Sequence, residues 1–109
     1  MAEDFFTVNA SLGTTQDVSV LSNSGSGKYI IILCQVANVD GASAANLFMD
    51  VYDSSATSAK AIAHEMIIPA DTALNPIGGK LVLESGDQLR AWASAVDDLE
   101  INISYLEIT

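Results

Sequence analysis

The stretch Lys28-Tyr29-Ile30-Ile31-Ile32-Leu33-Cys34-Gln35-Val36-Ala37 decides the fold class of this chain. It is a run of β-branched, aromatic and aliphatic residues without a helical repeat, which predicts a strand with little exposure to water. Turn-forming residues bound it on both sides, Asn23-Ser24-Gly25-Ser26-Gly27 before it and Asn38-Val39-Asp40-Gly41 after it. The longest apolar run of the chain therefore predicts a β-strand.

Similar but shorter runs lie on either side of this strand, separated by Gly, Asn, Asp and Ser. Ser85-Gly86-Asp87 predicts a tight hairpin turn, and the segment Ala70–Ile77, bracketed by Pro69, Pro76 and Gly78-Gly79, predicts a loop. We expect about eight strands, near Phe5–Val8, Val18–Leu21, Lys28–Ala37, Ala45–Asp53, Ala61–Ile68, Lys80–Leu83, Gln88–Ser94 and Leu99–Ile108. Such a pattern predicts an all-β, antiparallel β-sandwich of the jelly-roll type, because two packed sheets bury one face of each strand.

Alternation within the strands predicts which faces are buried. Leu47, Met49 and Val51 point one way, whereas Phe48 and Tyr52 flank Asp50 on the other face, which is either an interface or a surface with scattered aromatics. In the last strand the apolar face consists of Leu99, Ile101, Ile103 and Tyr105. A helix over Ala56–Met66 is the main alternative to the all-β interpretation.

Length and composition bound the organisation of the chain. The 109 residues predict one β-sandwich domain over 1–109, with residues 1–28 able to include an N-terminal arm. A mean hydropathy of +0.33 suggests apolar surface that faces another subunit, although alanines on the surface would have the same effect. No run approaches the roughly 20 apolar residues of a membrane helix, so we expect no membrane partner.

The charge balance argues against nucleic acid as a partner. Four basic residues stand against 14 acidic ones, a formal net charge of −10, and such a surface repels phosphate.

Cys34, the only cysteine, is expected to be a buried thiol with no intrachain disulfide. The acidic start of the chain lacks the pattern of a secretory signal, and we expect a protein made and used without that export route.

No set of residues predicts catalysis, a cofactor or a metal site. His64 is the only histidine, and we expect it to be partly buried, hydrogen-bonded and on the same face as Ile62 and Met66. We expect the acidic groups at Asp97-Asp98, Asp50 with Asp53, and Asp87 near Glu84 to cap backbone amides in turns. The loop with Asn38 and Asp40 lacks the spacing of a dedicated calcium loop.

Five aromatic residues are the candidates for a protein interface. Trp92 shares a strand face with Gln88, Arg90 and Ser94, where it would act as an interface hot spot, as a platform for a sugar ring, or as a ring lying over the Arg90 stem. Two phenylalanines in a polar N-terminus either form a docking arm or pack the first strand. The complete set of candidates is Phe5, Phe6, Phe48, Tyr52 and Trp92.

Several segments resemble small structural proteins of tailed bacteriophages. They are Val36–Gly41, Val51-Tyr52-Asp53, Ile68-Pro69-Ala70, Gly79–Asp87 and Ser104–Ile108, and they span most of the chain after Lys28. The resemblance is to virion components of the jelly-roll or sandwich type, which include capsid decoration (cement) proteins and domains of tail or fibre proteins. It implies no catalytic residue.

The resemblance implies a non-enzymatic capsid decoration protein that binds the major capsid protein or other virion subunits across their junctions. It also implies a homo-oligomer, with a trimer expected by analogy, on the outer surface of the capsid after assembly in the host cytoplasm. The alternative function is a tail or fibre module that binds carbohydrate on a host surface, in which Trp92 would stack on a sugar ring.

Overall fold

The computed structural model describes residues 3–109, and Met1 and Ala2, where the expected domain and arm begin, lie outside the described residues. Nine strands and no helix are found within 3–109. Their bounds are β1 Glu3–Ser11, β2 Ser19–Ser22, β3 Lys28–Asn38, β4 Ala45–Asp53, β5 Ser58–Ile68, β6 Ala73–Leu74, β7 Leu81–Leu83, β8 Gln88–Ala93 and β9 Leu99–Ile108.

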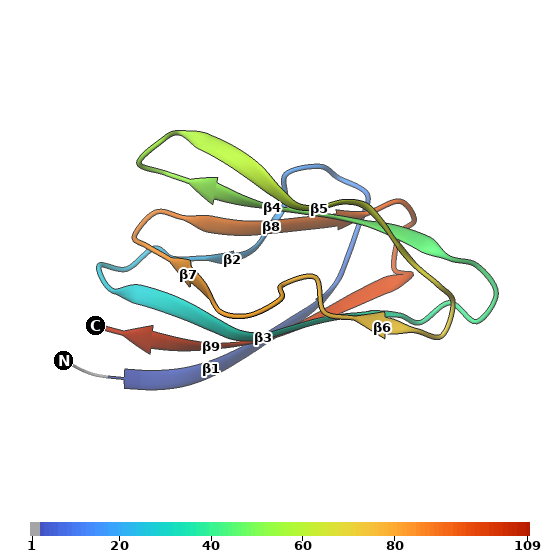
Figure 1. Ribbon diagram of the computed structural model, residues 1–109, viewed down its shortest axis with the longest axis horizontal. Coiled ribbons are helices and arrows are strands. Elements are labelled where there is room, and N and C mark those ends of the chain that lie inside the picture. Colours follow the sequence, from blue (N-terminus) through green and yellow to red (C-terminus); the bar gives the residue numbers. More distant parts are fainter. Residues whose placement is uncertain (1–2) are drawn as a thin grey trace.

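The strands form two antiparallel sheets that pack face to face (Figure 1). Sheet A has the order β1-β9-β3-β6, with β7 paired to β3 beyond the end of β6, and sheet B has the order β2-β8-β4-β5. If β6 and β7 are taken as one interrupted strand, the chain changes sheet at every connection except the β4–β5 hairpin. This is the order of a jelly roll, and the predicted fold class is confirmed.

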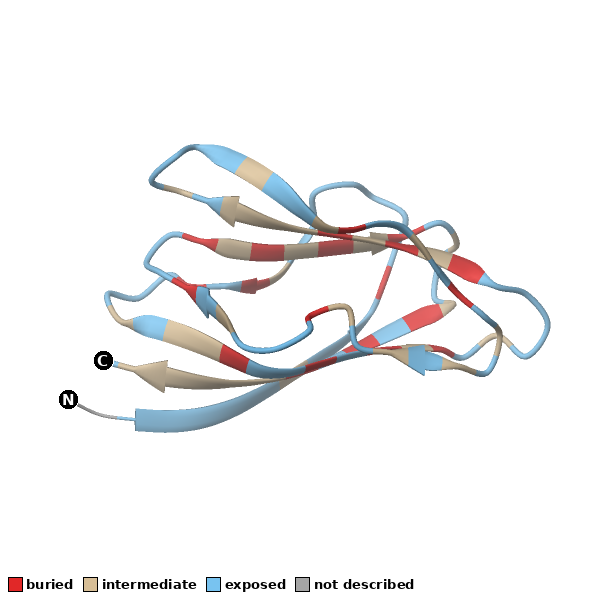
Figure 2. Ribbon diagram, in the orientation of Figure 1, coloured by how far each residue is buried: buried red, intermediate tan, exposed pale blue. Residues whose placement is uncertain are grey.

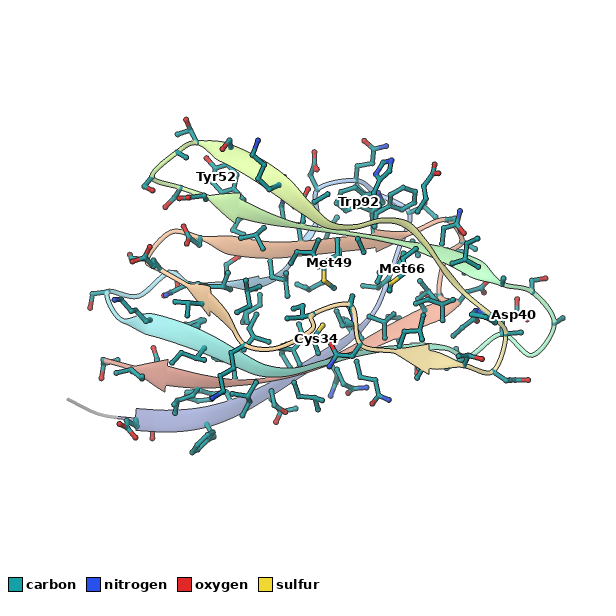
Figure 3. The ribbon with its side chains drawn as sticks, viewed as in Figure 1. Cys34, Asp40, Met49, Tyr52, Met66 and Trp92 are labelled. Carbon is teal, nitrogen blue, oxygen red and sulfur yellow. The ribbon has the colours of Figure 1, made fainter. Side chains whose placement is uncertain are left out.

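The core lies between the two sheets and is filled by the inward residues of each strand (Figure 2). Cys34 of sheet A and Met49 of sheet B are each about 1% exposed, and Figure 3 shows their sulfur atoms in the space between the sheets. The predicted alternation of β4 is confirmed, because Leu47 and Met49 are buried whereas Phe48 and Tyr52 point outward. The apolar face of β9 is also buried as predicted, apart from a half-buried Tyr105.

A bulge in β3 determines which residues of the long apolar run reach the core. Ile31 pairs with Tyr105 and Leu33 with Ser104, so Ile32 is an additional residue in this strand. Because the side chains of a strand alternate, this insertion turns Cys34 inward and leaves Ile32 and Leu33 exposed on the outer face. The sequence correctly predicts a buried Cys34.

One expectation about local structure is wrong. The segment predicted as a loop, Ala70–Ile77, contains the two-residue strand β6, whose Leu74 pairs with Val36. The strand expected near Ala61–Ile68 is confirmed, since residues 58–68 build β5 along the edge of sheet B, and the alternative helix over Ala56–Met66 does not form.

Two asparagines hold the turns at the ends of β3. Asn23 is 1% exposed, donates hydrogen bonds to the carbonyls of Gly27 and Leu83, and accepts one from the amide of Gly25. Asn38 bonds in the same way to the carbonyls of Ser43 and Ile68. Each amide thereby satisfies backbone groups that the turns leave without a ladder partner.

Candidate functional site: two outward sheet faces

The outward face of sheet A carries a row of apolar side chains that runs across four strands. Phe5 of β1 pairs with Leu106 of β9, Leu106 pairs with Ile30 of β3, and Ile30 pairs with Val82 of β7. Phe5 is 72% exposed and Val82 48%, whereas the two central residues are half-buried by their neighbours. We call these four residues the apolar ladder.

The bulge in β3 widens the apolar ladder. Ile32 and Leu33 are 43% and 44% exposed, and they lie beside Ser104 in the next row of the same face. An inward-facing residue would normally separate two outward ones, so the bulge places two large apolar groups in succession on the surface. The half of sheet A nearest the chain termini therefore has a contiguous apolar surface, which is a feature of interaction sites.

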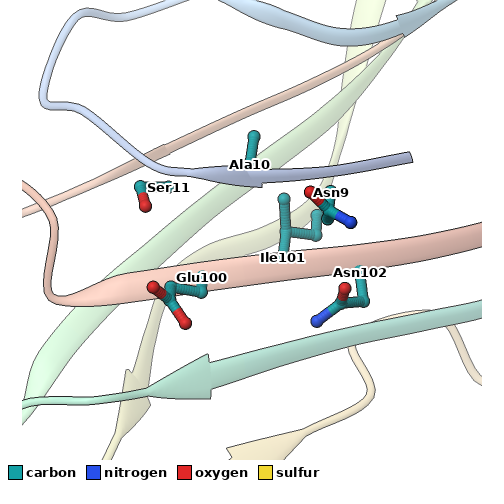
Figure 4. A pocket seen from close by; sticks show the side chains of 6 residues that line it. All are labelled: Asn9, Ala10, Ser11, Glu100, Ile101 and Asn102. Carbon is teal, nitrogen blue, oxygen red and sulfur yellow. The ribbon is translucent and has the colours of Figure 1, made fainter.

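The other half of this face is polar. Asn9, Asn102 and Gln35 pair across β1, β9 and β3, and all three are exposed. A shallow depression between β1 and β9, shown in Figure 4, lies in this half; its lining residues are Asn9, Ala10, Ser11, Glu100, Ile101 and Asn102. The lining holds one carboxylate, that of Glu100, and one hydroxyl, that of Ser11, but no basic side chain, and the depression suggests no chemistry.

Phe6 points to the opposite side of β1 from Phe5 and belongs to an aromatic trio at one end of the core. Its ring stacks on Tyr105 at a centroid distance of 5.5 Å, and Tyr105 stacks on Tyr29 at 4.8 Å. Burial raises the pKa of Tyr105, with smaller contributions from Tyr29 and Glu107. The two phenylalanines, adjacent in sequence, therefore belong to different surfaces, because residues of a strand alternate in direction.

The outward face of sheet B carries a row of three rings. Phe48 of β4 and Trp92 of β8 are cross-strand partners, and their rings stack in parallel with centroids 5.7 Å apart. The ring of His64 on β5 meets Phe48 edge-on at 5.6 Å. As Figure 3 shows for the labelled Trp92, this group points away from the core.

The next row of sheet B is an ion pair with an aromatic neighbour. Arg90 bonds to the Asp50 carboxylate, with 2.7 Å between Nε and Oδ1, and its side chain is only 17% exposed. Its guanidinium carbon lies 5.4 Å from the centre of the Tyr52 ring, within cation–π range. Asp17 adds a second, longer contact of 3.6 Å to Nη2.

Two sequence-based expectations about this face need correction. His64 is exposed and not partly buried, and it does not share a face with Met66, because β5 bulges between the residues paired with Leu47 and Met49. Glu65 in this bulge has a positive φ of 54°. Asp50, expected to cap a turn, is instead the partner of Arg90.

Asp87 and Asp53 cap turns as expected. Asp87 accepts hydrogen bonds from the amides of Glu84 and Ser54, and Asp53 accepts one from the amide of Ser55. The hydroxyl and amide of Ser55 lower the pKa of Asp53. Burial, followed by the charge of Asp40, raises the pKa of Asp98.

No reactive constellation is found in the described part of the chain. Residues 3–109 contain no group of three or more His, Cys, Asp and Glu side chains that could hold a metal ion. Burial raises the pKa of the Cys34 thiol to about 11, which disfavours the nucleophilic thiolate. Within residues 3–109 no helix is long and apolar enough to cross a bilayer.

The five interface candidates thus divide among three places, and sequence reasoning missed most of the apolar ladder. Phe5 lies outward on sheet A, Phe6 lies at the core end, and Phe48, Tyr52 and Trp92 share the outward face of sheet B. The three other ladder residues are Ile30, Val82 and Leu106. Only the change of pattern at Leu106 and Ile108, where apolar residues enter the polar side of the last strand, was visible in the sequence.

Comparisons with known proteins support the fold. Neither a protein-family model nor a curated protein matches this sequence. Among solved structures, a protein of the disulfide-linked pili that form Bacillus endospore appendages is similar, with a TM-score of 0.53 and 11% identity over 97% of this chain and 86% of that chain. VP2 of infectious bursal disease virus, solved as a subviral particle, has a TM-score of 0.51 and 11% identity over 97% of this chain, which spans 32% of that protein. At such identities the likeness shows a shared β-sandwich fold.

Proposed function

We propose that the chain is a non-enzymatic structural subunit of a protein assembly, and specifically a bacteriophage capsid decoration protein. The observation that carries this proposal is the presence of apolar or aromatic side chains in cross-strand register on both outward faces of the sandwich. A soluble monomer gains nothing from such groups on two opposite faces, whereas a subunit between neighbours buries them.

The similar solved structures support a role in assembly. One comes from work on pili and the other from a subviral particle, and both are built from many copies of their subunits. Cys34 is 1% exposed, so this chain would associate through side-chain packing and not through the disulfide links named for those pili.

Sheet B carries the residue types expected at a contact with a different protein. Trp92, Arg90 and Tyr52 lie together on it, and Trp, Arg and Tyr are the residues most enriched among interface hot spots. We assign this face, with Phe48, to the capsid shell. The net charge of −10 favours a place on the outer surface of the capsid, away from the packaged nucleic acid.

Stabilisation of the shell follows from mass action. A subunit that binds across junctions of the assembled shell, and not to free capsid protein, shifts the equilibrium toward the assembled form. No chemical step is needed, and the stabilisation grows with the concentration of free decoration protein.

The proposal is tested by sedimenting the purified chain with assembled shells of the phage that encodes it. We expect saturable binding that Trp92→Ala weakens by roughly tenfold or more, as for a hot spot. Val39→Ala is the matched control, because Val39 is an exposed apolar residue in the turn after β3, outside the strands of sheet B. Failure of the wild-type chain to bind shells would overturn the proposal.

The pair of stacked rings also supports one alternative, a tail or fibre module that binds carbohydrate. Phe48 and Trp92 stand on an open sheet face, and aromatic rings of this kind stack on sugar rings. Trp92 is the only tryptophan, so its fluorescence reports directly on this face. A change in emission with a glycan panel, together with no response to shells, would favour the alternative.

A further inference from the structure

We propose that two copies of the chain associate through the outward faces of their sheets A, about a two-fold axis that runs parallel to strand β9. The proposal concerns self-association and goes beyond the shell-binding function, which we assign to the opposite face. It rests on the distribution of apolar and charged residues in the rows of sheet A.

The outward face of sheet A lacks the acidic surplus of the molecule. The chain has 14 acidic and four basic residues, yet the outward positions of β1, β9 and β3 hold only Glu3, Glu100 and Lys28 as charged groups. Two such faces can approach each other with little of the repulsion that a net charge of −10 would otherwise cause.

The apolar ladder is complementary to itself under this symmetry. A two-fold axis parallel to β9 places β9 over β9 of the second copy, and β1 over its β3, while each row stays at the same height. Phe5 then packs on Ile30 of the second copy, and Leu106 packs on the other Leu106. The Phe5–Ile30 contact occurs twice in such a dimer, whereas the Leu106–Leu106 contact lies on the axis and occurs once.

The row next to the apolar ladder carries opposite charges at its two ends. Ile108 pairs with Glu3 on one side and with Lys28 on the other. Two strand spacings, about 10 Å, separate Glu3 from Lys28 within one chain, which is too far for an ion pair. Under the proposed symmetry each Glu3 faces Lys28 of the second copy, which closes the apolar contact at one end with two ion pairs.

This geometry differs from the trimer that the bacteriophage resemblance implies. A three-fold ring needs two different surfaces in contact, whereas the ladder and the Glu3–Ile108–Lys28 row fit a second copy of themselves. The dimer leaves both sheet B faces outward and free to bind elsewhere.

The first test is the solution mass of the full chain by light scattering across a tenfold concentration range. We expect a dimer, and we expect Phe5→Ser to weaken dimerisation by roughly a hundredfold, because two phenylalanines leave each interface. Ile67→Ser removes an apolar side chain that is 63% exposed on β5 and should leave the mass unchanged. A monomeric or trimeric wild-type chain overturns the proposal.

The second test exchanges charges and is specific for the two-fold contact. Glu3→Lys and Lys28→Glu should each weaken the dimer, because each places like charges opposite one another twice. An equimolar mixture of these two variants should recover the dimer, since both contacts then pair a lysine with a glutamate. Circular dichroism of each variant verifies the fold before its mass is measured.

The outcomes separate this proposal from the shell-binding function. A wild-type dimer whose mass does not respond to Phe5→Ser or to the charge exchange associates elsewhere and overturns the proposal. A monomer that still sediments with shells overturns the dimer and leaves the proposed function in place. A dimer that responds as expected but does not bind shells supports the two-fold contact and overturns the proposed function.

Discussion

Arg90 and Asp50 form a two-point ion pair across strands β8 and β4, with 2.7 Å between Nε and Oδ1 and 3.1 Å between Nη2 and Oδ2. The pair occupies the row beside Phe48 and Trp92. A planar guanidinium that meets both carboxylate oxygens tolerates little displacement along the strands. The ion pair therefore helps to hold the register in which the two aromatic rings stack.

Removal of Arg90 should destabilise the fold measurably. The Asp50 side chain is 14% exposed, and Arg90→Ala leaves this carboxylate without its partner. We expect a loss of about 1 to 3 kcal/mol in the free energy of unfolding, measured by urea denaturation. Lys60→Ala, at an exposed position of β5, should cost about 0.5 kcal/mol or less. Equal losses in the two variants would contradict a structural role for the ion pair.

The double variant sharpens this test. Because Asp50→Ala removes the orphaned carboxylate, the combined Asp50→Ala and Arg90→Ala change should cost less than the sum of the single changes. Additive losses would show that the two side chains do not interact in solution.

Substitution of Gly27 should loosen the end of β9. A Cβ at Gly27 would overlap the carbonyl oxygen of Ile108, a backbone atom that moves only with its strand. We expect Gly27→Ala to cost about 1 to 3 kcal/mol and to speed amide hydrogen exchange near Ile108. Gly13→Ala is the control, because a Cβ there meets no atom within 4 Å. An unchanged rate of amide hydrogen exchange at the end of β9 would contradict the close approach of Gly27 to Ile108.

The side-chain amide of Asn23 should contribute more to the free energy of unfolding than an exposed amide of the same type. Asn23→Ala leaves the carbonyls of Leu83 and Gly27 without a side-chain donor in a site that is 1% exposed. We expect thermal unfolding to show a loss of about 2 to 4 kcal/mol, because several buried polar groups lose partners together. Asn102→Ala, on the outward face of β9, should be nearly neutral. A neutral Asn23→Ala would contradict the bonding described for this turn.

The buried thiol makes stability depend on alkaline pH. The pKa of Cys34 is raised from 9.0 to about 11, so below pH 9 the thiol is protonated in both the folded and the unfolded chain. As pH rises toward 11, only the unfolded chain ionises at this group, and its contribution to stability is lost. Cys34→Ala should therefore flatten the decline in stability between pH 9 and 11.

Urea titrations of both chains across this range provide the measurement, and the difference between them isolates the contribution of Cys34 from that of every other group. Parallel declines in the two chains would contradict the raised pKa. In a native chain at pH 8, alkylation of the thiol by iodoacetamide should be slow and should accelerate in urea.

The sequence predicts most of this fold because its strands are long, alternate regularly and are separated by strong turn residues. The bounds of β4 and β9 match those expected, and β3 differs by one residue. Strand β6 could not be predicted, since its two residues lie between Pro69 and Pro76 and are ordered only by pairing with β3. Tertiary pairing there outweighs the local preference for a loop.

The outward faces were harder to predict because bulges change the side on which residues lie. A regular alternation places His64 with Met66 and gives no reason to expect Ile32 and Leu33 to be exposed together. Cross-strand registers between β1, β9, β3 and β7 are likewise set by the whole sheet. The apolar ladder is therefore a property of the folded sheet, and the sequence indicates only its residues Phe5 and Leu106.

The most direct test of the central claim, that this sandwich is an outer subunit of a capsid, is sedimentation of the purified chain with assembled shells and, separately, with unassembled capsid protein. We predict saturable binding to the shells, weakened by Trp92→Ala and accompanied by a change in Trp92 fluorescence, and no binding to the free subunits. A chain that stays in the supernatant with shells at every concentration would contradict the account.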